Sequence, residues 1–309
     1  MKPPVILLIG PTASGKTAAA LQLAERFNAE IVSVDSALVY RDMNIGTAKP
    51  SAEEKARVPH HLIDLIDPTE RYSVAQFLHD AMAAIRDIQS RGRMPLLVGG
   101  TMLYANALLV GMSDVPPTDD VIRAQVNAEI ASHGIEALHA KLRTVDPETA
   151  QRLAPADAQR IGRAYEVFLQ TGQPLSSMQS QRKCALSEVA HFVIRWQPQD
   201  RAWLHARCEE RLRTMFDSGF VDEVKSLTTK YSLTPDMSSM RCVGYRQVLD
   251  VLRGRAPENE MFDRALFATR QLAKRQLTWL RSLPGEIVYC DAVDAVARAT
   301  VLVQERLGR

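Results

Sequence analysis

The stretch that decides the fold is Gly10-Pro11-Thr12-Ala13-Ser14-Gly15-Lys16-Thr17. It follows the apolar run Val5–Ile9 and precedes residues 18–24, which combine strong helix formers with a leucine stripe. The order is therefore strand, glycine-bearing loop and helix, and the loop matches the phosphate-loop pattern G-x-x-x-x-G-K-[ST] throughout. The backbone N–H groups of such a loop form a concave nest, and the helix N-terminus and Lys16 add positive charge. We expect this loop to bind a di- or triphosphate, with the Thr17 hydroxyl beside a Mg²⁺ ion.

The composition limits the class of protein. The net charge of the 309 residues is only +2, so a nucleic-acid site has to be a local patch rather than the whole surface. The four cysteines are widely spaced and contain no C-x-x-C pair, which fits a reduced compartment and neither a disulfide framework nor a zinc ribbon. No apolar run approaches the length of a membrane span, and the first one is too short for a signal peptide. We expect a cytoplasmic monomer that does not associate with a membrane.

Two further strands are expected, and each is followed by residues that could take part in binding or catalysis. Glu30–Val34 ends at Asp35, and Pro95–Val98 ends at a Gly-Gly turn followed by Thr101. Between these strands, Ser73 and Gln76 predict the start of a helix through a capping box. Alternating strands and helices predict an α/β fold, a P-loop NTPase-like parallel sheet with helices on both faces. The carboxyl ends of such strands form the ligand-binding edge.

A helical insertion is expected within this sheet domain. After a Pro-rich break at residues 115–118 we find only helical segments, at Asp119–Ser132, Glu136–Thr144 and Asp157–Gln170. The predicted organisation is a first core part at residues 1–116, an all-helical insertion at 117–191 and a second core part at 192–309. Strands at His191–Trp196 and Ile287–Cys290 and a long helix at about Met261–Arg281 belong to the core.

Three side chains are candidates for chemistry, each with an alternative role. Asp35 is either a general base or a helix cap or magnesium-water ligand. Thr101 either binds a phosphate oxygen or caps the helix that starts at Met102. Arg211 either neutralises a leaving diphosphate or forms a surface ion pair with a nearby glutamate.

The adjacent histidines His60 and His61 invite a metal interpretation. Neighbouring residues of a strand face opposite sides, and no cysteine or third histidine stands at ligand spacing. We expect a structural pair.

Two clusters of basic residues suggest a nucleic-acid partner. The segment from Arg264 to Gly285 holds five basic residues and no acidic one, and Arg270, Lys274 and Arg281 share a helical face. A smaller cluster lies at residues 159–163 of the insertion. Either cluster could be a solvated face, but two of them with one phosphate loop favour contact with a nucleic-acid backbone.

Several blocks resemble the bacterial tRNA dimethylallyltransferases, and the resemblance runs from the first strand to about Leu283. The blocks Gly-Thr-Ala-Lys-Pro and Thr-Arg-Gln-Leu-Ala-Lys-Arg-Gln are much more specific than the phosphate loop. The matching segments are Gly10–Thr17, Val34–Ser36 with Tyr40, Ile45–Pro50, Pro59–Asp64, Gly99–Tyr104, Arg241–Gln247 and Thr269–Gln276.

The resemblance implies an activity and a set of site residues. The expected reaction transfers a dimethylallyl group from dimethylallyl diphosphate to N6 of adenosine 37 in tRNA, beside the anticodon, and forms N6-isopentenyladenosine. The predicted catalytic residues are Asp35, Thr101 and Arg211. The predicted diphosphate-binding residues are Gly10, Pro11, Thr12, Ala13, Ser14, Gly15, Lys16 and Thr17. The predicted tRNA contacts are Asp35, Ser36, Ala37, Leu38, Thr101, Arg123, Gln159, Arg160, Ile161, Gly162, Arg163, Cys242, Val243, Gly244, Tyr245, Arg246, Gln247, Lys274, Arg275, Gln276, Leu277, Thr278, Trp279, Leu280 and Arg281.

Some positions depart from the family pattern. Leu38 stands where many members have Gln, and Asp42 stands where glycine is common. Gly162 weakens the expected helix around it by about 1 kcal/mol. We expect no C-terminal zinc finger like that of the eukaryotic relatives.

Two other enzyme classes stay open as alternatives. A nucleotide isopentenyltransferase would need neither the basic helix nor the insertion. A small-molecule kinase with a phosphate loop would use ATP and usually carries an arginine-rich lid. A nucleotide-driven switch would need loops that sense a γ-phosphate, and we find none.

Overall fold

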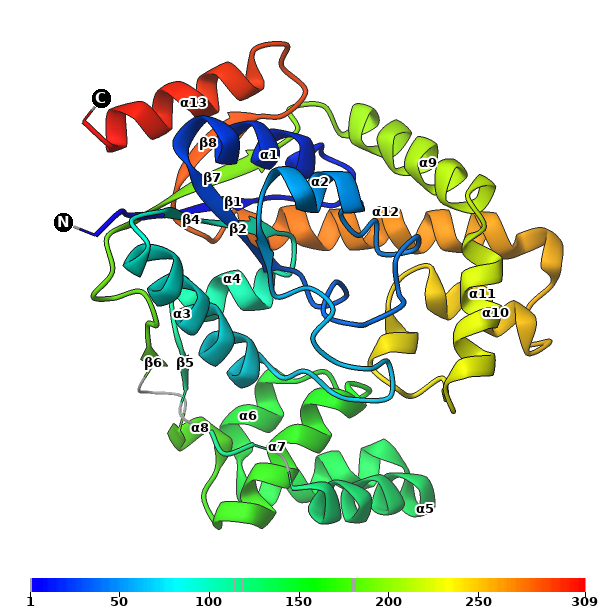
Figure 1. Cartoon of the computed structure of the whole chain (residues 1–309). Coiled ribbons are helices and arrows are strands. Elements are labelled where there is room, and N and C mark those ends of the chain that lie inside the picture. The colour runs from blue at the N-terminus through cyan, green and yellow to red at the C-terminus, as the bar shows by residue number, and fades with distance from the viewer. Residues whose placement is uncertain (1, 114, 118, 179–181, 309) are drawn as a thin grey trace. The chain divides into compact units, whose positions relative to one another are not determined.

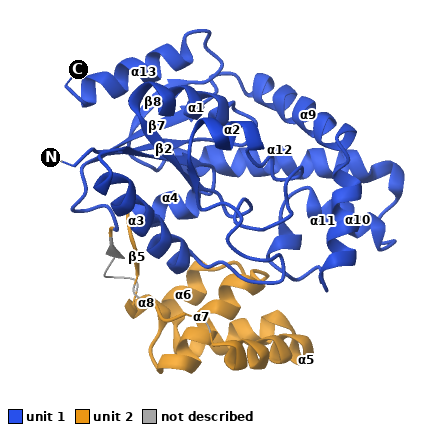
Figure 2. Cartoon of the chain, viewed as in Figure 1, with its two compact units in different colours: residues 1–109, 185–309 blue, residues 110–184 orange. Residues whose placement is uncertain are grey.

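The computed structural model describes residues 2–113, 115–117, 119–178 and 182–308 (Figure 1). The chain divides into two compact units, Met1–Leu109 with Ala185–Arg309, and Val110–Cys184 (Figure 2). No helix of the described residues is long and apolar enough to cross a membrane.

The first unit is built around a six-stranded sheet in which every pairing is parallel. The strand order is β3-β2-β4-β1-β7-β8, so the strand that leads into the phosphate loop lies between β4 and β7. The predicted parallel α/β sheet is therefore confirmed. The strands are β1 (Val5–Ile9), β2 (Ala29–Val34), β3 (His60–His61), β4 (Met94–Gly99), β7 (His191–Gln197) and β8 (Glu286–Tyr289).

Helices cover both faces of this sheet (Figure 1). Figure 1 shows α1 and α13 on one face and α3 and α4 on the other. The side chains of α1 and α13 bury an apolar cluster against alternate residues of β1, β4, β7 and β8. The helices of this unit are α1 (Lys16–Phe27), α2 (Ala52–Arg57), α3 (Val74–Ser90), α4 (Met102–Leu109), α9 (Arg201–Asp217), α10 (Phe220–Lys230), α11 (Tyr245–Leu252), α12 (Met261–Leu280) and α13 (Ala295–Arg306), with short 3-10 turns at Ser239–Arg241 and Glu258–Glu260.

The start of α3 follows the predicted capping chemistry. The Gln76 backbone N–H donates to Ser73 Oγ at 3.1 Å, and the Ser73 N–H donates to Gln76 Oε1 at 2.8 Å. Both ends of the capping box are therefore formed, which satisfies two N–H groups that the first helical turn leaves unpaired.

A second apolar cluster joins α9, α10, α11 and α12. At its centre Phe220 packs edge-on against Tyr245, with ring centroids 5.0 Å apart. Edge-to-face packing of buried aromatic rings adds to the stability that area burial gives. This cluster sets the position of α12, which carries the predicted basic face.

The second unit consists of helices together with a two-stranded ribbon. Its predicted helices are confirmed. The last one ends at Gly172, whose φ is 70°, as expected, and the structure adds that the Asp157 side chain caps its start. The two helical segments predicted on either side of Gly134 form one element with a kink at that glycine. The elements are α5 (Asp120–Val145), α6 (Pro147–Arg152), α7 (Ala158–Thr171), α8 (Leu175–Met178), β5 (Met112–Ser113) and β6 (Arg182–Lys183).

The bounds predicted for the insertion are about seven residues too late at both ends. The unit begins at Val110 and ends at Cys184, because β5 and β6 lie near its two ends and pair antiparallel with each other. Beyond it, the Leu186 N–H donates to the Leu108 carbonyl at 3.3 Å, so the chain has already returned to the first unit. Strands of two residues carry too little alternation for a sequence pattern to reveal them.

Candidate active site

Hydrogen bonds from Trp196 of the sheet and within the loop itself hold the phosphate loop in its conformation. The Trp196 indole N–H donates to the Ser14 carbonyl at 2.8 Å, and Ser14 Oγ donates to the Pro11 carbonyl at 2.8 Å. Gly10 leaves no room for a side chain, because a Cβ there would lie 1.9 Å from the Trp196 carbonyl oxygen. The loop conformation is therefore fixed by the sheet below it as well as by its own sequence.

Lys16 turns back onto its own loop. Its ammonium group donates to the Pro11 carbonyl and lies 3.5 Å from Ser14 Oγ. Burial, together with the positive charge of Arg211, lowers the pKa of Lys16 to about 8, while the charge of Asp35 opposes this shift. A diphosphate bound in the loop would place negative charge beside the Lys16 ammonium and so stabilise its charged form.

Asp35 lies directly after β2 and is half-buried. The Ala37 backbone N–H donates to its Oδ1 at 2.8 Å. Burial raises the pKa of Asp35, and the Ala37 amide and the charge of Lys16 offset only part of that shift. No helix begins here, so the helix-cap interpretation is wrong, and a carboxylate with a raised pKa is a better proton acceptor.

Thr101 connects the ends of two strands. Its Oγ1 accepts the Ser36 N–H at 3.0 Å and donates to Ser36 Oγ at 3.2 Å. Its carbonyl, rather than its hydroxyl, accepts the N–H groups of Tyr104 and Ala105 in the first turn of α4. The hydroxyl therefore joins the turn after β4 to the residue that follows Asp35.

Arg211 extends from α9 to the phosphate loop. Its guanidinium donates to Thr12 Oγ1, and burial lowers the pKa of Arg211. Within the described residues no carboxylate lies within 4 Å of it, and its buried Nε has no partner. The surface ion pair offered as an alternative is therefore wrong, because the neighbouring glutamates pair with other arginines.

These groups meet in one cavity of about 640 Å³. It joins the end of the phosphate loop, the ends of β2 and β4, and parts of α9, α11 and α12. Of the residues predicted for the site, the following line it: Thr12, Lys16, Thr17, Asp35, Ser36, Ala37, Leu38, Thr101, Arg211, Cys242, Val243, Gly244, Tyr245, Arg275, Gln276 and Trp279.

Several predicted RNA contacts have side chains that point into the protein. Ile161 and Leu280 are fully buried, so an RNA contact by these side chains is wrong. Tyr245 is buried too, but it lines the cavity, and its RNA contact stays a prediction. Gln276 is buried too, where it accepts from the Thr12 N–H and donates to the Gly100 carbonyl. Gly162 is also buried, next to Val126. A helix that presents one face to a ligand must bury the other, and a continuous stretch contains both faces.

The basic residues divide into paired and unpaired ones. Lys274 and Arg275 of α12 and Arg281, which directly follows it, are exposed and have no carboxylate within 4 Å among the described residues. Arg270, predicted on the same face, pairs with Glu209 of α9 at 2.9 Å. Arg246 is exposed at the start of α11.

The basic residues of the insertion unit lie beside acidic ones. Arg160 pairs with Asp157 at 2.7 Å, and Arg123 and Arg163 each lie 3.7 Å from the buried Glu166. Gln159 is exposed. The RNA contacts of these residues stay predictions.

Both histidines of the pair hydrogen-bond within the protein, which fits the expected structural role. The His61 ring lies 2.7 Å from the Glu30 carboxylate, and the His60 ring lies 2.7 Å from the Val58 carbonyl. Among the described residues no three His, Cys, Asp or Glu side chains gather as metal ligands.

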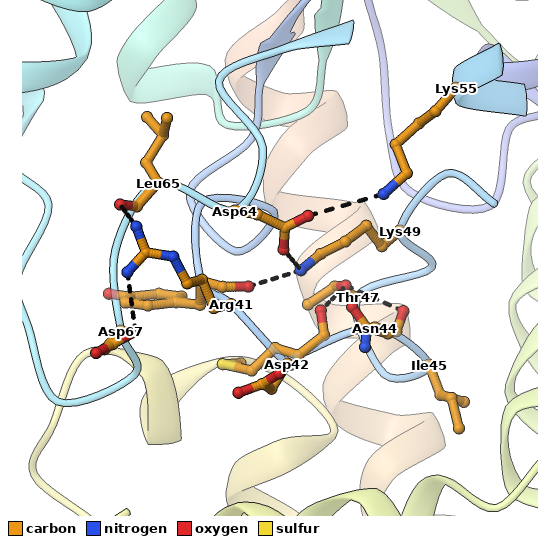
Figure 3. A network of polar contacts seen from close by, with 12 residues as sticks. Arg41, Asp42, Asn44, Ile45, Thr47, Lys49, Lys55, Asp64, Leu65 and Asp67 are labelled. Carbon is orange, nitrogen blue, oxygen red and sulfur yellow. Dashed lines mark hydrogen bonds and ion pairs between the residues drawn. The ribbon is translucent and has the colours of Figure 1, made fainter. Parts of the chain in front are cut away.

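A polar network that the sequence reasoning missed holds the loop after β2 (Figure 3). The nearly buried Lys49 donates to the Tyr40 carbonyl at 2.6 Å and to the Asp64 carboxylate. Lys49 and Asp64 belong to the two family-like blocks at residues 45–50 and 59–64. The pairing of Lys49 with Asp64 joins the two blocks in space, and no sequence pattern links residues 15 positions apart in loops.

The fold and this cavity define a phosphate-binding α/β protein of the P-loop class. A family model described as IPP transferase matches residues 38–283, and one described as isopentenyl transferase matches residues 3–64. The chain belongs to the IPP transferase family.

Individual relatives agree with this membership. The chain is 56% identical to a tRNA dimethylallyltransferase of Burkholderia ambifaria, over 96% of this chain and 92% of that protein. It is 35% identical to the solved tRNA isopentenylpyrophosphate transferase of Bacillus halodurans, with a TM-score of 0.71 and coverage of 99% and 97%. A solved eukaryotic dimethylallyltransferase acting on tRNA is 26% identical, with a TM-score of 0.84 and coverage of 99% and 80%.

The low pKa of Lys16 predicts how diphosphate binding depends on pH. Below pH 8 the ammonium is charged and attracts the ligand, and above it the free protein must first gain a proton. Affinity for an alkyl diphosphate ester should therefore weaken as pH rises through 8, approaching about tenfold per pH unit. Calorimetric titration at several pH values measures this slope. Lys16→Arg keeps its charge and should remove the dependence, and a flat profile for the natural protein would contradict the assignment.

Proposed function

We propose that this chain transfers a dimethylallyl group from dimethylallyl diphosphate to N6 of adenosine 37 in tRNA and so forms N6-isopentenyladenosine. The observation that carries the proposal is that Lys16 of the phosphate loop and Asp35 line one cavity. A cavity of about 640 Å³ has the size typical of small-molecule sites and accepts a five-carbon diphosphate together with a purine.

The donor binds through its diphosphate. The loop amides, the α1 N-terminus, Lys16 and Arg211 supply positive charge where the diphosphate lies. As the allylic C1–O bond breaks, negative charge grows on the bridging oxygen, and the same groups stabilise it. A transferase of this kind uses no γ-phosphate, so ATP is not needed.

The acceptor is adenine, whose N6 lone pair is delocalised into the ring and is a weak nucleophile. The N6–C1 bond forms while the C1–O bond breaks, the N6 proton passes to the Asp35 carboxylate, and diphosphate leaves. The raised pKa of Asp35 suits it to accept that proton. Thr101 Oγ1 holds the Ser36 amide and thereby orients the turn that carries the carboxylate.

The base reaches this cavity only when it is turned out of the stack of the anticodon loop. In a single-stranded loop this costs little. Leu38 lines the cavity and offers an apolar surface to the purine where many relatives have an amide.

Magnesium fits the residues present. Thr17 has an exposed hydroxyl on the cavity that Asp35 also lines, and Mg²⁺ takes most of its ligands from phosphate oxygens and water, so a cage of three protein carboxylates is not required. Bound with the diphosphate, Mg²⁺ would add positive charge beside the leaving group.

The RNA partner is the anticodon stem-loop of a tRNA, and we propose that a single cytoplasmic copy of the chain acts on it. Within the described residues, the cations Lys274 and Arg275 of α12 and Arg281 at its end have no carboxylate partner, and they suit a phosphate backbone. An enzyme acting on free adenine nucleotides would not need them.

A direct assay separates the three enzyme classes. Labelled dimethylallyl diphosphate is incubated with unmodified tRNA or with adenosine monophosphate, each with and without ATP. Label should enter tRNA without ATP, and nuclease digestion should place it on the adenosine beside the anticodon. Strict dependence on ATP would favour a kinase, and label entering only the mononucleotide would favour a nucleotide prenyltransferase.

Asp35→Asn should lower turnover by about 10²- to 10⁴-fold, because the amide cannot accept the N6 proton. Affinity for the diphosphate should change little, since the loop itself is intact. Single-turnover rates and donor affinity, measured on the same preparation, test both points. A rate like that of the natural protein would remove Asp35 from the mechanism.

Replacing Lys274 and Arg281 together by alanine should weaken tRNA binding and flatten its dependence on salt. Each phosphate contact that is lost lowers the slope of log affinity against log salt by roughly 0.7 to 0.9. Arg298, which is exposed on α13 and pairs with Asp294, provides a matched control for lost charge. If the double variant keeps the natural slope, α12 does not contact the RNA.

A further inference from the structure

One wall of the cavity is a loop without regular structure. Gly46, Thr47 and Ala48 line the cavity, and they stand about ten residues beyond Asp35 in the chain. Since the loop is neither helix nor strand, its position depends on contacts that its neighbours make with it.

The Glu223 carboxylate of α10 provides the main contacts. Its Oε2 accepts the N–H groups of Asn44 at 2.9 Å and Ile45 at 2.7 Å, and its Oε1 lies 3.2 Å from the Gly46 N–H that donates to it. Hydrogen bonds to an ionised carboxylate are roughly twice as strong as neutral ones. Glu223 itself does not line the cavity, so it acts on it through this loop.

The same carboxylate holds a second wall. The Tyr245 hydroxyl donates to Glu223 Oε1 at 2.5 Å, and Gly244 and Tyr245 line the cavity from α11. Burial and the negative charge of Glu223 raise the pKa of Tyr245, so its hydroxyl stays a donor.

Gly46 packs directly on the aromatic rings behind it. A Cβ at this position would lie 2.1 Å from the Phe220 ring and 2.7 Å from the Tyr245 ring. The loop therefore contacts the Phe220 and Tyr245 rings as well as the Glu223 carboxylate, and it cannot move closer to α10.

We propose that Glu223 is a positioning residue for prenyl transfer. Its carboxylate binds both the loop at residues 44–46 and Tyr245, and so fixes the distance between these two walls of the cavity. The proposal rests on the proposed function. The width of the cavity between these walls decides whether the adenine lies within reach of Asp35, and a misplacement of about 1 Å can cost roughly a hundredfold in rate. An amide cannot replace the carboxylate, since its NH₂ end would face either backbone N–H groups or the Tyr245 hydroxyl.

A brace that serves stability alone would behave differently in kinetics. It would lower the melting temperature and the folded fraction but leave kcat for each folded molecule unchanged. A positioning role lowers kcat itself while the diphosphate affinity stays the same, because the phosphate loop is held separately by Trp196 and Gln276.

The test compares Glu223→Gln with Asp222→Asn, the exposed neighbour on α10 whose carboxylate pairs with Lys225. We expect kcat for tRNA to fall about 10- to 100-fold in Glu223→Gln, corrected for folded fraction, with donor affinity within about twofold. Amide exchange at residues 44–46 should become faster. Asp222→Asn should match the natural protein in all three measurements. Unchanged kcat in folded Glu223→Gln would overturn the proposal.

Gly46→Ala tests the same wall without touching the carboxylate, in case Glu223→Gln does not fold. Its added methyl group collides with Phe220 and Tyr245 and displaces the loop toward the cavity, so kcat should fall in the same way with donor affinity preserved. Natural kcat in this variant would also overturn the proposal. If the natural protein prenylated no tRNA, the proposed function would fail, whereas the exchange and donor-binding measurements would still report on the Glu223 contacts.

Discussion

The carboxamide of Gln276 is the interaction on which the site depends. Its Oε1 accepts the Thr12 N–H at 2.8 Å and its Nε2 donates to the Gly100 carbonyl at 2.8 Å, and the side chain is buried at the wall of the cavity. A Cβ at Gly100 would lie 2.6 Å from that amide nitrogen, so the turn after β4 has to be glycine to approach so closely. The phosphate loop, the Thr101 turn and helix α12 are thereby joined by one side chain. A buried amide that lost either partner would leave a polar group unsatisfied, which costs about 1–3 kcal/mol.

Features that arise from short-range chemistry could be predicted from the sequence. The phosphate loop, the strand that ends at Asp35 and the capping box at Ser73 each involve residues within a few positions of one another. The same holds for the helix from Asp157 to Gly172. Parallel pairing then brought the strand ends together, because alternation with helices leaves few other topologies. The prediction that Lys16, Asp35 and Thr101 share one cavity is confirmed for this reason.

Contacts between distant residues left no comparable pattern. Trp196 is 182 positions from Ser14, Gln276 is 264 from Thr12, and Glu223 is 179 from Asn44. The resemblance placed Gln276 among the RNA contacts, yet its side chain faces the protein, because a block of eight helical residues cannot show which ones point inward.

The departure at Asp42 has a physical basis that only the structure reveals. Its φ of 62° is one that glycine adopts easily, and its carboxylate accepts from Lys230 at 2.7 Å and Tyr231 at 2.5 Å, which offsets the strain.

The chemistry depends on how the three charges of the cavity are separated. Within the described residues, Asp35 forms no ion pair with Lys16 or Arg211, and its partners are the neutral backbone amides of Ala37 and Leu38. A direct pair with Arg211 would hold the pKa of Asp35 low and make it a poor base, and it would also occupy a cation that the leaving diphosphate needs. Separation lets burial raise the pKa of Asp35 while both cations stay available on the phosphate side. Each of the three charges bears a desolvation cost, and a substrate that brings negative charge to Lys16 and Arg211 offsets the cost of these two on binding. The phosphate-loop motif requires a lysine and the strand end supplies a carboxylate, but neither encodes the distance between them, which the packing of β2 against β4 and of α9 against α12 determines.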